Sequence, residues 1–254
     1  MFDLILIGIG TGNPDHLTAQ GAKAIRQADL ILIPRKGTGK TDLAGLRRQI
    51  IAQVAGDTPP RIAHFDIPDR RADNGYLQGV GDWHDAIACI WRDTVAAADP
   101  APKSVALLIW GDPSLYDSSL RIAARLDPAP NVRVIPGITA LQALTAAHCI
   151  PLNEIGAPVL VTTGRQLRDG GWPDEVDTIA VMLDGQCSFQ TLEQGDYDIW
   201  WGAYLGMKEE VLIAGSLSEV KPRILATRAQ AREGHGWIMD IYMLKKRHPD
   251  GANR

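Results

Sequence analysis

Short apolar runs, bounded by glycine and proline, alternate with amphipathic stretches along the first half of the chain. Runs without polar alternation are typical of strands that are buried on both faces of a parallel sheet. They predict strands at 3–10, 30–34, 104–113 and 132–137. Parallel strands need a crossover connection, usually a helix, so the chain is expected to begin with a mostly parallel α/β sheet.

The stretches between these runs carry helical periodicity. Apolar residues recur at helical spacing, and one helix is expected to begin after an N-cap at Asp82. Apart from a helix at its centre, the segment 35–81 is polar and is predicted to be irregular. The expected helices cover 17–28, 43–54, 84–98 and 119–126.

The pattern changes after Gly137. A helix is expected at 139–149, followed by strands at 158–164, 178–183, 199–205, 210–217 and 236–244. Partial alternation of polar and apolar residues in the run at 210 and in the run at 236 predicts antiparallel pairing. The prediction is therefore an α/β fold of two domains, 1–137 with a mostly parallel sheet and 138–254 with a mixed sheet.

The composition limits which functions remain open. The 254 residues carry a net charge of −4 with a pI of about 5.9, whereas nucleic-acid-binding domains usually have a basic excess. No apolar run approaches the roughly 20 residues that span a bilayer, and the apolar N-terminus resembles a strand more than a signal peptide. Three separated cysteines and six scattered histidines predict neither a disulfide framework nor a metal site. We therefore expect a cytoplasmic protein without a metal, a membrane or a nucleic-acid partner.

One stretch, IPRKGTGKTDL at 33–43, ends like a phosphate-binding P-loop. A P-loop requires Gly-x4-Gly-Lys-Ser/Thr between a strand and a helix, because successive backbone N–H groups wrap the phosphates. Here Pro34 stands where the first glycine belongs, and proline lacks an N–H and fixes φ. Three interpretations stay open: a nucleotide-binding loop, a flexible polar loop, or a basic loop that binds an anion through Arg35, Lys36 and Lys40.

Three glycine-containing turns follow predicted strands, in GIGTGNPDHLT, LLIWGDPSLYDSS and VIPGITALQALTAA. Because the carboxyl ends of parallel strands share one edge, these turns should lie where open α/β sheets bind ligands. Each turn also has a local explanation: a tight glycine turn, an Asp-Pro turn, or capping of the next helix by Thr139. The pattern alone does not choose between a ligand site and these local explanations.

Taken together and in order, these motifs resemble those of the tetrapyrrole (precorrin) methyltransferase family. The resemblance is carried by GIGTGNPDHLTAQGAKAIRQADLILI, GDPSLY, VIPGITALQA, IPLNEIGAPVLVTTGR and TIAVML, which extend across most of the chain. It implies two α/β domains with S-adenosylmethionine (SAM) bound in the cleft between them. It also implies a homodimer, a small-molecule tetrapyrrole substrate and no metal.

The resemblance further implies which residues contact SAM. They are Thr11, Trp110, Gly111, Asp112, Leu115, Tyr116, Thr139, Ala140, Leu183 and Ala203. The chain departs from its relatives at Thr11, where they carry proline, at Trp110, and at Leu183, where they often carry methionine. Because the sulfonium of SAM already activates the methyl group, the protein mainly has to align the donor with the acceptor.

Within the family, the long insert at 34–81 makes the chain similar to members that act on precorrin-5. Their reaction methylates ring position 1 and releases acetate, a hydrolysis that requires a positioned water and acid–base assistance. Asp112 and Tyr116 are the catalytic candidates. Arg35 and Lys36 are candidates for binding the substrate's carboxylate arms. The alternatives are another precorrin methylase, a relative such as diphthine synthase, or a P-loop-like nucleotide-binding protein.

Overall fold

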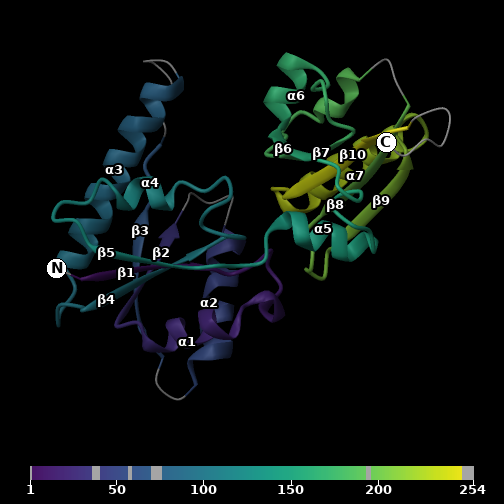
Figure 1. Cartoon of the computed structure of the whole chain (residues 1–254). Helices are drawn as coiled ribbons and strands as arrows, with labels where there is room; N and C mark the ends of the chain where they lie inside the picture. Colours follow the sequence, from purple (N-terminus) through teal and green to yellow (C-terminus); the bar gives the residue numbers. More distant parts are fainter. Residues whose placement is uncertain (1, 36–40, 57–58, 70–75, 193–195, 248–254) are drawn as a thin grey trace. The chain divides into compact units, whose positions relative to one another are not determined.

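The structure, a computed structural model, describes residues 2–35, 41–56, 59–69, 76–192 and 196–247. The chain divides into two compact units, Met1–Thr139 and Ala140–Arg254. Each unit contains one five-stranded sheet (Figure 1).

The sheet of the first unit is entirely parallel, with strand order β3-β2-β4-β1-β5. Its strands are β1 (Asp3–Gly8), β2 (Leu30–Arg35), β3 (Arg61–Asp66), β4 (Ser104–Ile109) and β5 (Asn131–Ile135). Its helices are α1 (Ala19–Gln27), α2 (Thr41–Ala55), α3 (Tyr76–Ala96), α4 (Ser119–Ala123) and the short 3-10 helix η1 (Pro14–His16). The predicted parallel sheet with helical crossovers is confirmed.

Side-chain alternation buries both faces of this sheet. In β1, Leu4 and Leu6 belong to one core, and Ile5 and Ile7 belong to the other. The strands β2 and β4 repeat this alternation, because successive residues of a strand point to opposite faces. Residues of α3 and α4 complete the first core, and residues of α1 and α2 complete the second.

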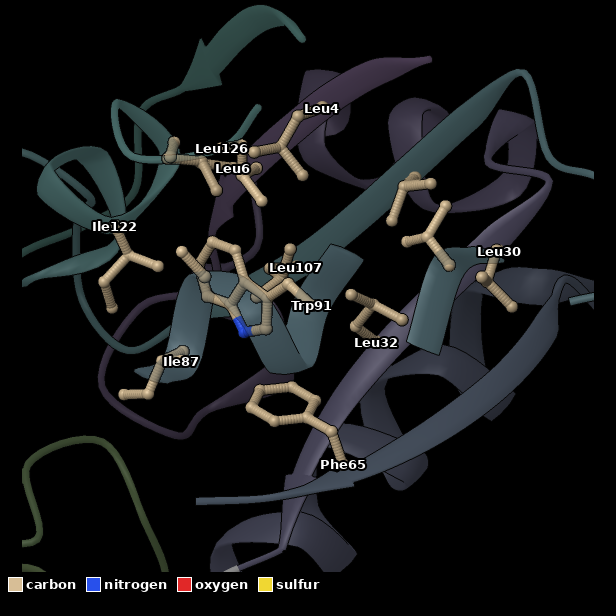
Figure 2. Close-up of a cluster of buried hydrophobic side chains, with 14 of the residues drawn as sticks. Leu4, Leu6, Leu30, Leu32, Phe65, Ile87, Trp91, Leu107, Ile122 and Leu126 are labelled. Atoms are coloured by element: carbon tan, nitrogen blue, oxygen red, sulfur yellow. The ribbon is translucent and has the colours of Figure 1, made fainter. Parts of the chain in front are cut away.

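Large side chains fill the first of these cores. Figure 2 shows Trp91 of α3 surrounded by aliphatic side chains from the sheet and from α4. Its ring meets Phe65 of β3 edge-on, with the ring centroids 6.2 Å apart, a geometry that the aromatic quadrupole favours. The contact attaches the edge strand β3 to α3.

Two predictions for the segment 35–81 are wrong. The segment contains β3, which the sequence analysis missed because an edge strand that is only partly buried lacks a continuous apolar run. The helix α3 begins at Tyr76, so Asp82 lies inside it and is not its N-cap. Gly79 and Gly81 lower the helix propensity of this stretch by about 1 kcal/mol each, which hid the helix from the sequence pattern.

The sheet of the second unit is mixed, with strand order β6-β7-β10-β8-β9. Its strands are β6 (Val159–Thr163), β7 (Thr178–Met182), β8 (Tyr197–Ala203), β9 (Val211–Ser216) and β10 (Asp240–Lys246). Its helices are α5 (Ala140–His148), α6 (Gly164–Gly170), α7 (Leu217–His235) and the 3-10 helix η2 (Ser188–Thr191). The mixed sheet is confirmed, and both strands that were expected to pair antiparallel do so: β9 pairs with β8, and β10 pairs with β7 and β8. The helices α6 and α7 were not predicted.

The strand directions bring three carboxyl ends to one edge of the second sheet. β6 and β7 are parallel, and β10 runs antiparallel to both β7 and β8. β8 therefore runs in the same direction as β7, so β6, β7 and β8 all end at that edge. Across the described part of the chain, no helix combines the length and hydrophobicity that a membrane span requires.

A histidine is buried on α3. His84 is 3% exposed, and no described residue forms a hydrogen bond with its Nε2. Burial lowers the pKa of His84, and the charges of Arg125 and Arg121 lower it further. Asp85 and Asp117 oppose this effect to a smaller extent. The folded state therefore favours the neutral imidazole.

We expect acid to destabilise the fold through His84. The unfolded chain protonates this histidine below about pH 6.5, but the folded chain binds the proton only at lower pH. The contribution is complete above pH 6.5 and is lost as the pH falls through the lowered folded-state pKa. Urea unfolding from about pH 7.5 to about pH 5 measures this loss. His84→Leu should flatten the dependence, and an equally steep dependence in the variant would contradict the prediction.

Candidate functional site

Three glycine-containing turns meet at the carboxyl edge of the first sheet. The turn after β1 and the turn after β4 form an antiparallel bridge between Gly10 and Gly111. The Gly111 N–H donates to the Gly10 carbonyl at 2.8 Å, and the Gly10 N–H donates back at 3.3 Å. The turn after β5 joins them through Gly137. The predicted convergence of these motifs is therefore present in the fold of the first unit.

The turns approach one another so closely that side chains are excluded. A Cβ on Gly137 would lie 2.2 Å from the Gly111 carbonyl oxygen, and a Cβ on Gly8 would lie 2.5 Å from the Gly137 nitrogen. Cβ atoms do not approach other heavy atoms to such distances, so backbone packs directly against backbone here. Glycine is required at both positions because the neighbouring backbone leaves no room for a Cβ.

Asp112 locks this arrangement. It is 8% exposed, and one carboxylate oxygen accepts hydrogen bonds from the Ser114 N–H and hydroxyl. The other oxygen accepts from the Gly137 N–H at 2.9 Å. Burial opposes ionisation, but the hydrogen bonds from Ser114 and Gly137 outweigh it and lower the pKa of Asp112. Asp112 is thus an ionised clamp between two turns, and this geometry favours a positioning role over proton transfer.

The remaining predicted cofactor residues of the first unit lie along these turns. Thr11 is 4% exposed, and its hydroxyl oxygen lies 3.1 Å from His16 Nδ1. Trp110 and Leu115 are half-buried. Tyr116 is 43% exposed and has a φ of 51°, and partial burial raises the pKa of its phenol.

The space around Gly111 fits a bound group. A Cβ added to Gly111 would come within 4.0 Å of the Thr139 Cα and of no other nearby atom. The backbone of two predicted contact residues, Gly111 and Thr139, therefore borders this space. A ligand that approaches the backbone closely needs this kind of opening.

In the second unit, two of the three predicted cofactor residues lie at the edge where β6, β7 and β8 end. Leu183 directly follows β7, is 67% exposed and has a φ of 54°. Ala203 ends β8 and is fully buried. Ala140 begins α5 and is half-buried. The structure brings the first two of these to the same sheet edge.

The proposed basic residues are placed only in part. Lys36, like Lys40, lies outside the described residues. Arg35 ends β2, and its guanidinium forms two contacts with Asp66 of β3, at 3.0 and 3.1 Å. A carboxylate of the chain itself therefore already occupies one side of this guanidinium. Pro34 lies within β2, so the first position of the supposed P-loop belongs to a strand.

Sequence reasoning missed a half-buried cation at the same sheet edge. β2 and β4 pair only as far as Leu32 and Leu107, and beyond that point the Leu108 carbonyl lacks a strand partner on the β2 side. Arg47 of α2 supplies one, because its Nε donates to this carbonyl at 2.9 Å. Burial lowers the pKa of Arg47 to about 10, against the opposing charge of Asp117, so the group stays protonated at neutral pH. An amphipathic pattern gives no signal for such a contact.

Sequence reasoning also missed a charge network in the second unit. Arg228 of α7 pairs with Asp240 of β10, and the carbonyl of Asp184 accepts a hydrogen bond from the same guanidinium. All three residues are buried or nearly so. Within the described residues, no group of three or more histidine, cysteine, aspartate or glutamate side chains is arranged to hold a metal ion.

Comparison with known proteins identifies the family to which this protein belongs. The family described as Tetrapyrrole (Corrin/Porphyrin) Methylases matches residues 3–221. The chain therefore belongs to the tetrapyrrole methylase family, and it is a methyltransferase that uses SAM as its methyl donor. The resemblance noted from the sequence motifs is confirmed.

Individual members of the family differ in how similar they are to this chain. Precorrin-6A synthase (deacetylating) from Sinorhizobium sp is 47% identical over 251 residues, which are 97% of this chain and 96% of that protein. Precorrin-2 C(20)-methyltransferase from Sinorhizobium sp is 31% identical over 155 residues, 59% of this chain and 60% of the relative. The crystal structure of a cobalamin synthesis related protein (CobF) from Corynebacterium diphtheriae is similar with a TM-score of 0.81 and 36% identity, and the match covers 97% of this chain and 99% of that one.

The close backbone contact predicts opposite effects for two glycine substitutions. Gly137→Ala forces a Cβ against the Gly111 carbonyl and should destabilise the first unit by about 1–3 kcal/mol. Gly81→Ala, the matched control within α3, meets no atom within 4 Å and should stabilise the protein by about 1 kcal/mol. Urea unfolding measures both effects. Equal stability of the two variants would show that the turns are not packed as described.

Proposed function

We propose that the chain catalyses the SAM-dependent methylation of precorrin-5 at ring position 1, with release of acetate, to give precorrin-6A. The observation that carries this proposal is the 47% identity to precorrin-6A synthase (deacetylating), which extends over 97% of the chain. The similarity to CobF along nearly its whole length supports the same assignment. This reaction belongs to cobalamin biosynthesis, and we propose that it takes place in the cytoplasm.

The chain's own residues supply alignment in this proposal. SAM, when bound, supplies an activated methyl group, so binding and orientation account for most of the protein's task. We propose that SAM contacts the residues at the Gly10–Gly111 bridge, near Thr139 and around Leu183. Asp112 holds the first of these regions rigid through its hydrogen bonds to Gly137 and Ser114.

The deacetylation step requires a positioned water and acid–base assistance. Of the two catalytic candidates, Tyr116 has the more exposed side chain, and its raised pKa keeps the phenol protonated at neutral pH. We assign it the proton-donating role in this proposal. Asp112 uses both carboxylate oxygens within the chain, and we assign it the positioning role.

The substrate carries carboxylate arms that need cationic partners. We propose that Arg35 and Lys36 bind them, and that Asp66 holds the Arg35 guanidinium in a fixed plane. Arg–carboxylate pairing is planar and directional, so an arginine held by one carboxylate can still present other N–H groups to a second.

Two other functions within the family receive less support. Diphthine synthase from Pyrobaculum calidifontis is 28% identical over 165 residues and matches 54% of that protein, a weaker and shorter similarity. Precorrin-2 C(20)-methyltransferase matches little more than half of the chain. The nucleotide-binding interpretation has lost its geometric support, because Pro34 lies in β2. A homodimer remains part of the proposal on the basis of the family resemblance.

Incubation with SAM and precorrin-5 tests the proposed reaction. We expect one methyl group to be added, measured by mass spectrometry, together with an equal amount of free acetate. Methylation without acetate release would remove the deacetylating assignment. Calorimetry should also detect binding of S-adenosylhomocysteine and no binding of ATP, and the opposite result would favour a nucleotide-binding protein.

Arg35→Ala tests the carboxylate-binding role. Loss of one charge-assisted contact should raise the KM for the tetrapyrrole by about tenfold while the affinity for S-adenosylhomocysteine stays unchanged. Arg133→Ala, in the exposed edge strand β5, is a suitable control for the loss of a surface charge. Equal KM values for Arg35→Ala and the wild type would contradict the role.

A further inference from the structure

A buried carboxylate organises the loop that follows β7. Oδ1 of Asp184 accepts hydrogen bonds from the Gln186 N–H at 3.1 Å and from the Ser188 hydroxyl at 2.9 Å. Oδ2 accepts from the Ser188 N–H and from the Tyr242 hydroxyl, the latter at 2.6 Å. The donors come from the loop itself, from η2 and from β10. The carboxylate therefore attaches the loop to the centre of the sheet.

The neighbouring helix packs against this carboxylate so closely that its first residue has no room for a side chain. A Cβ on Gly164, the first residue of α6, would lie 2.2 Å from the Asp184 Cγ. Burial, with the adjacent Asp184 charge, raises the pKa of the Tyr242 phenol, so the hydroxyl remains a donor at any physiological pH. The position of Asp184 is thus fixed from three sides.

This attachment holds a backbone that the chain would not adopt on its own. Leu183 and Cys187, on either side of Asp184, have φ values of 54° and 56°. Non-glycine residues visit this left-handed region rarely, because Cβ approaches the backbone. Such strain persists only where surrounding contacts over-determine the conformation, and it is concentrated at ligand sites. Leu183 has this conformation at the sheet edge, directly after β7, and the residue is 67% exposed.

Arg228 of α7 connects this loop to the end of β8. Its Nη2 donates to the Asp184 carbonyl at 3.1 Å, and its Nε donates to Asp240 Oδ2 at 2.7 Å. The same Asp240 oxygen accepts from Trp201 Nε1 of β8 at 3.1 Å. Asp240 also stands opposite Ala203 in the pairing of β10 with β8. One guanidinium therefore fixes the ends of β7 and β8 relative to each other.

We infer that the Asp184–Arg228–Asp240 network is a positioning device for the cofactor, which holds Leu183 and Ala203 at the spacing that SAM binding requires. The inference rests on the proposed function, because the roles of Leu183 and Ala203 in binding SAM belong to it. Burying a charge pair is costly for stability, and apolar residues of similar volume often serve as well. A role in orienting two segments explains the arginine, because its planar guanidinium donates in fixed directions to two separate acceptors.

Arg228→Lys tests the inference. Lysine keeps the charge, but its single ammonium cannot reproduce the planar fork that reaches both Asp184 and Asp240. We expect the Kd for S-adenosylhomocysteine and the KM for SAM to rise about tenfold, while kcat and the KM for the tetrapyrrole stay near their wild-type values. Calorimetry and steady-state kinetics on the full chain measure these quantities.

Arg247→Lys is the matched control. Arg247 also donates two hydrogen bonds to an aspartate, Asp198, but that residue lies near the amino end of β8, at the opposite edge of the sheet. This control should leave the affinity for S-adenosylhomocysteine unchanged. An equal loss of affinity in both variants, or in neither, would overturn the inference.

Tyr242→Phe provides a second test that removes one hydrogen bond to Asp184 and little volume. It should also weaken S-adenosylhomocysteine binding, whereas Ile199→Val, a change in the buried part of β8, should lower stability without affecting binding. If Tyr242→Phe lost stability but bound the cofactor product like the wild type, the network would be structural only. If the wild type itself failed to bind S-adenosylhomocysteine, the proposed function would fail instead.

Discussion

The first unit depends on the direct contact of backbone with backbone at the carboxyl edge of its sheet. Three turns approach to distances at which a single Cβ on Gly8 or Gly137 would collide. The contact aligns the N–H of Gly137 with the carboxylate of Asp112, and that hydrogen bond ties the turn after β4 to the turn after β5. Because the contact leaves no room for a side chain at Gly8 or Gly137, backbone packs directly against backbone there.

In the second unit, side-chain charges hold the loops at the carboxyl edge of the sheet in place, not contacts between backbones. The guanidinium of Arg228 donates hydrogen bonds both to the Asp184 carbonyl, in the loop after β7, and to the Asp240 carboxylate of β10. Both units place an aspartate immediately after a residue implied in SAM binding, Asp112 after Gly111 and Asp184 after Leu183. In each case the carboxylate accepts the N–H of the residue two positions further on, a turn that short polar side chains favour. The two sheet edges thus share the same aspartate turn, although the contacts around that turn differ between the units.

These arrangements suit an enzyme whose cofactor supplies the reactive group. A methyltransferase needs a fixed geometry more than it needs strong acids or bases, so rigid turns matter more than titrating side chains. Both carboxylate oxygens of the catalytic candidate Asp112 accept hydrogen bonds from within the chain, from Ser114 and Gly137. Tyr116 retains a partly exposed phenol, whose pKa is raised by partial burial.

The sequence predicted the elements whose signal is local. The strands β1, β2 and β4 were correctly located because continuous apolar runs mark strands that are buried on both faces. β3 and the start of α3 were missed, because a partly exposed edge strand and a helix with two glycines depend on packing partners distant in sequence. The long helix α7 was missed for a related reason: its sequence is mostly polar, and only a few of its residues, Leu217, Ile224 and Arg228, are buried.

The sequence by itself determined the fold class, the parallel first sheet and the set of glycine turns at its carboxyl edge, since buried strands and turn residues leave their signal in short stretches of chain. Only the tertiary structure decided what individual side chains do there. It paired Arg35 with Asp66, joined Asp112 to Gly137, and directed Arg47 to the Leu108 carbonyl and Arg228 to Asp240. Such contacts join residues far apart in sequence, and their energies depend on burial and direction, which appear only when the chain has folded.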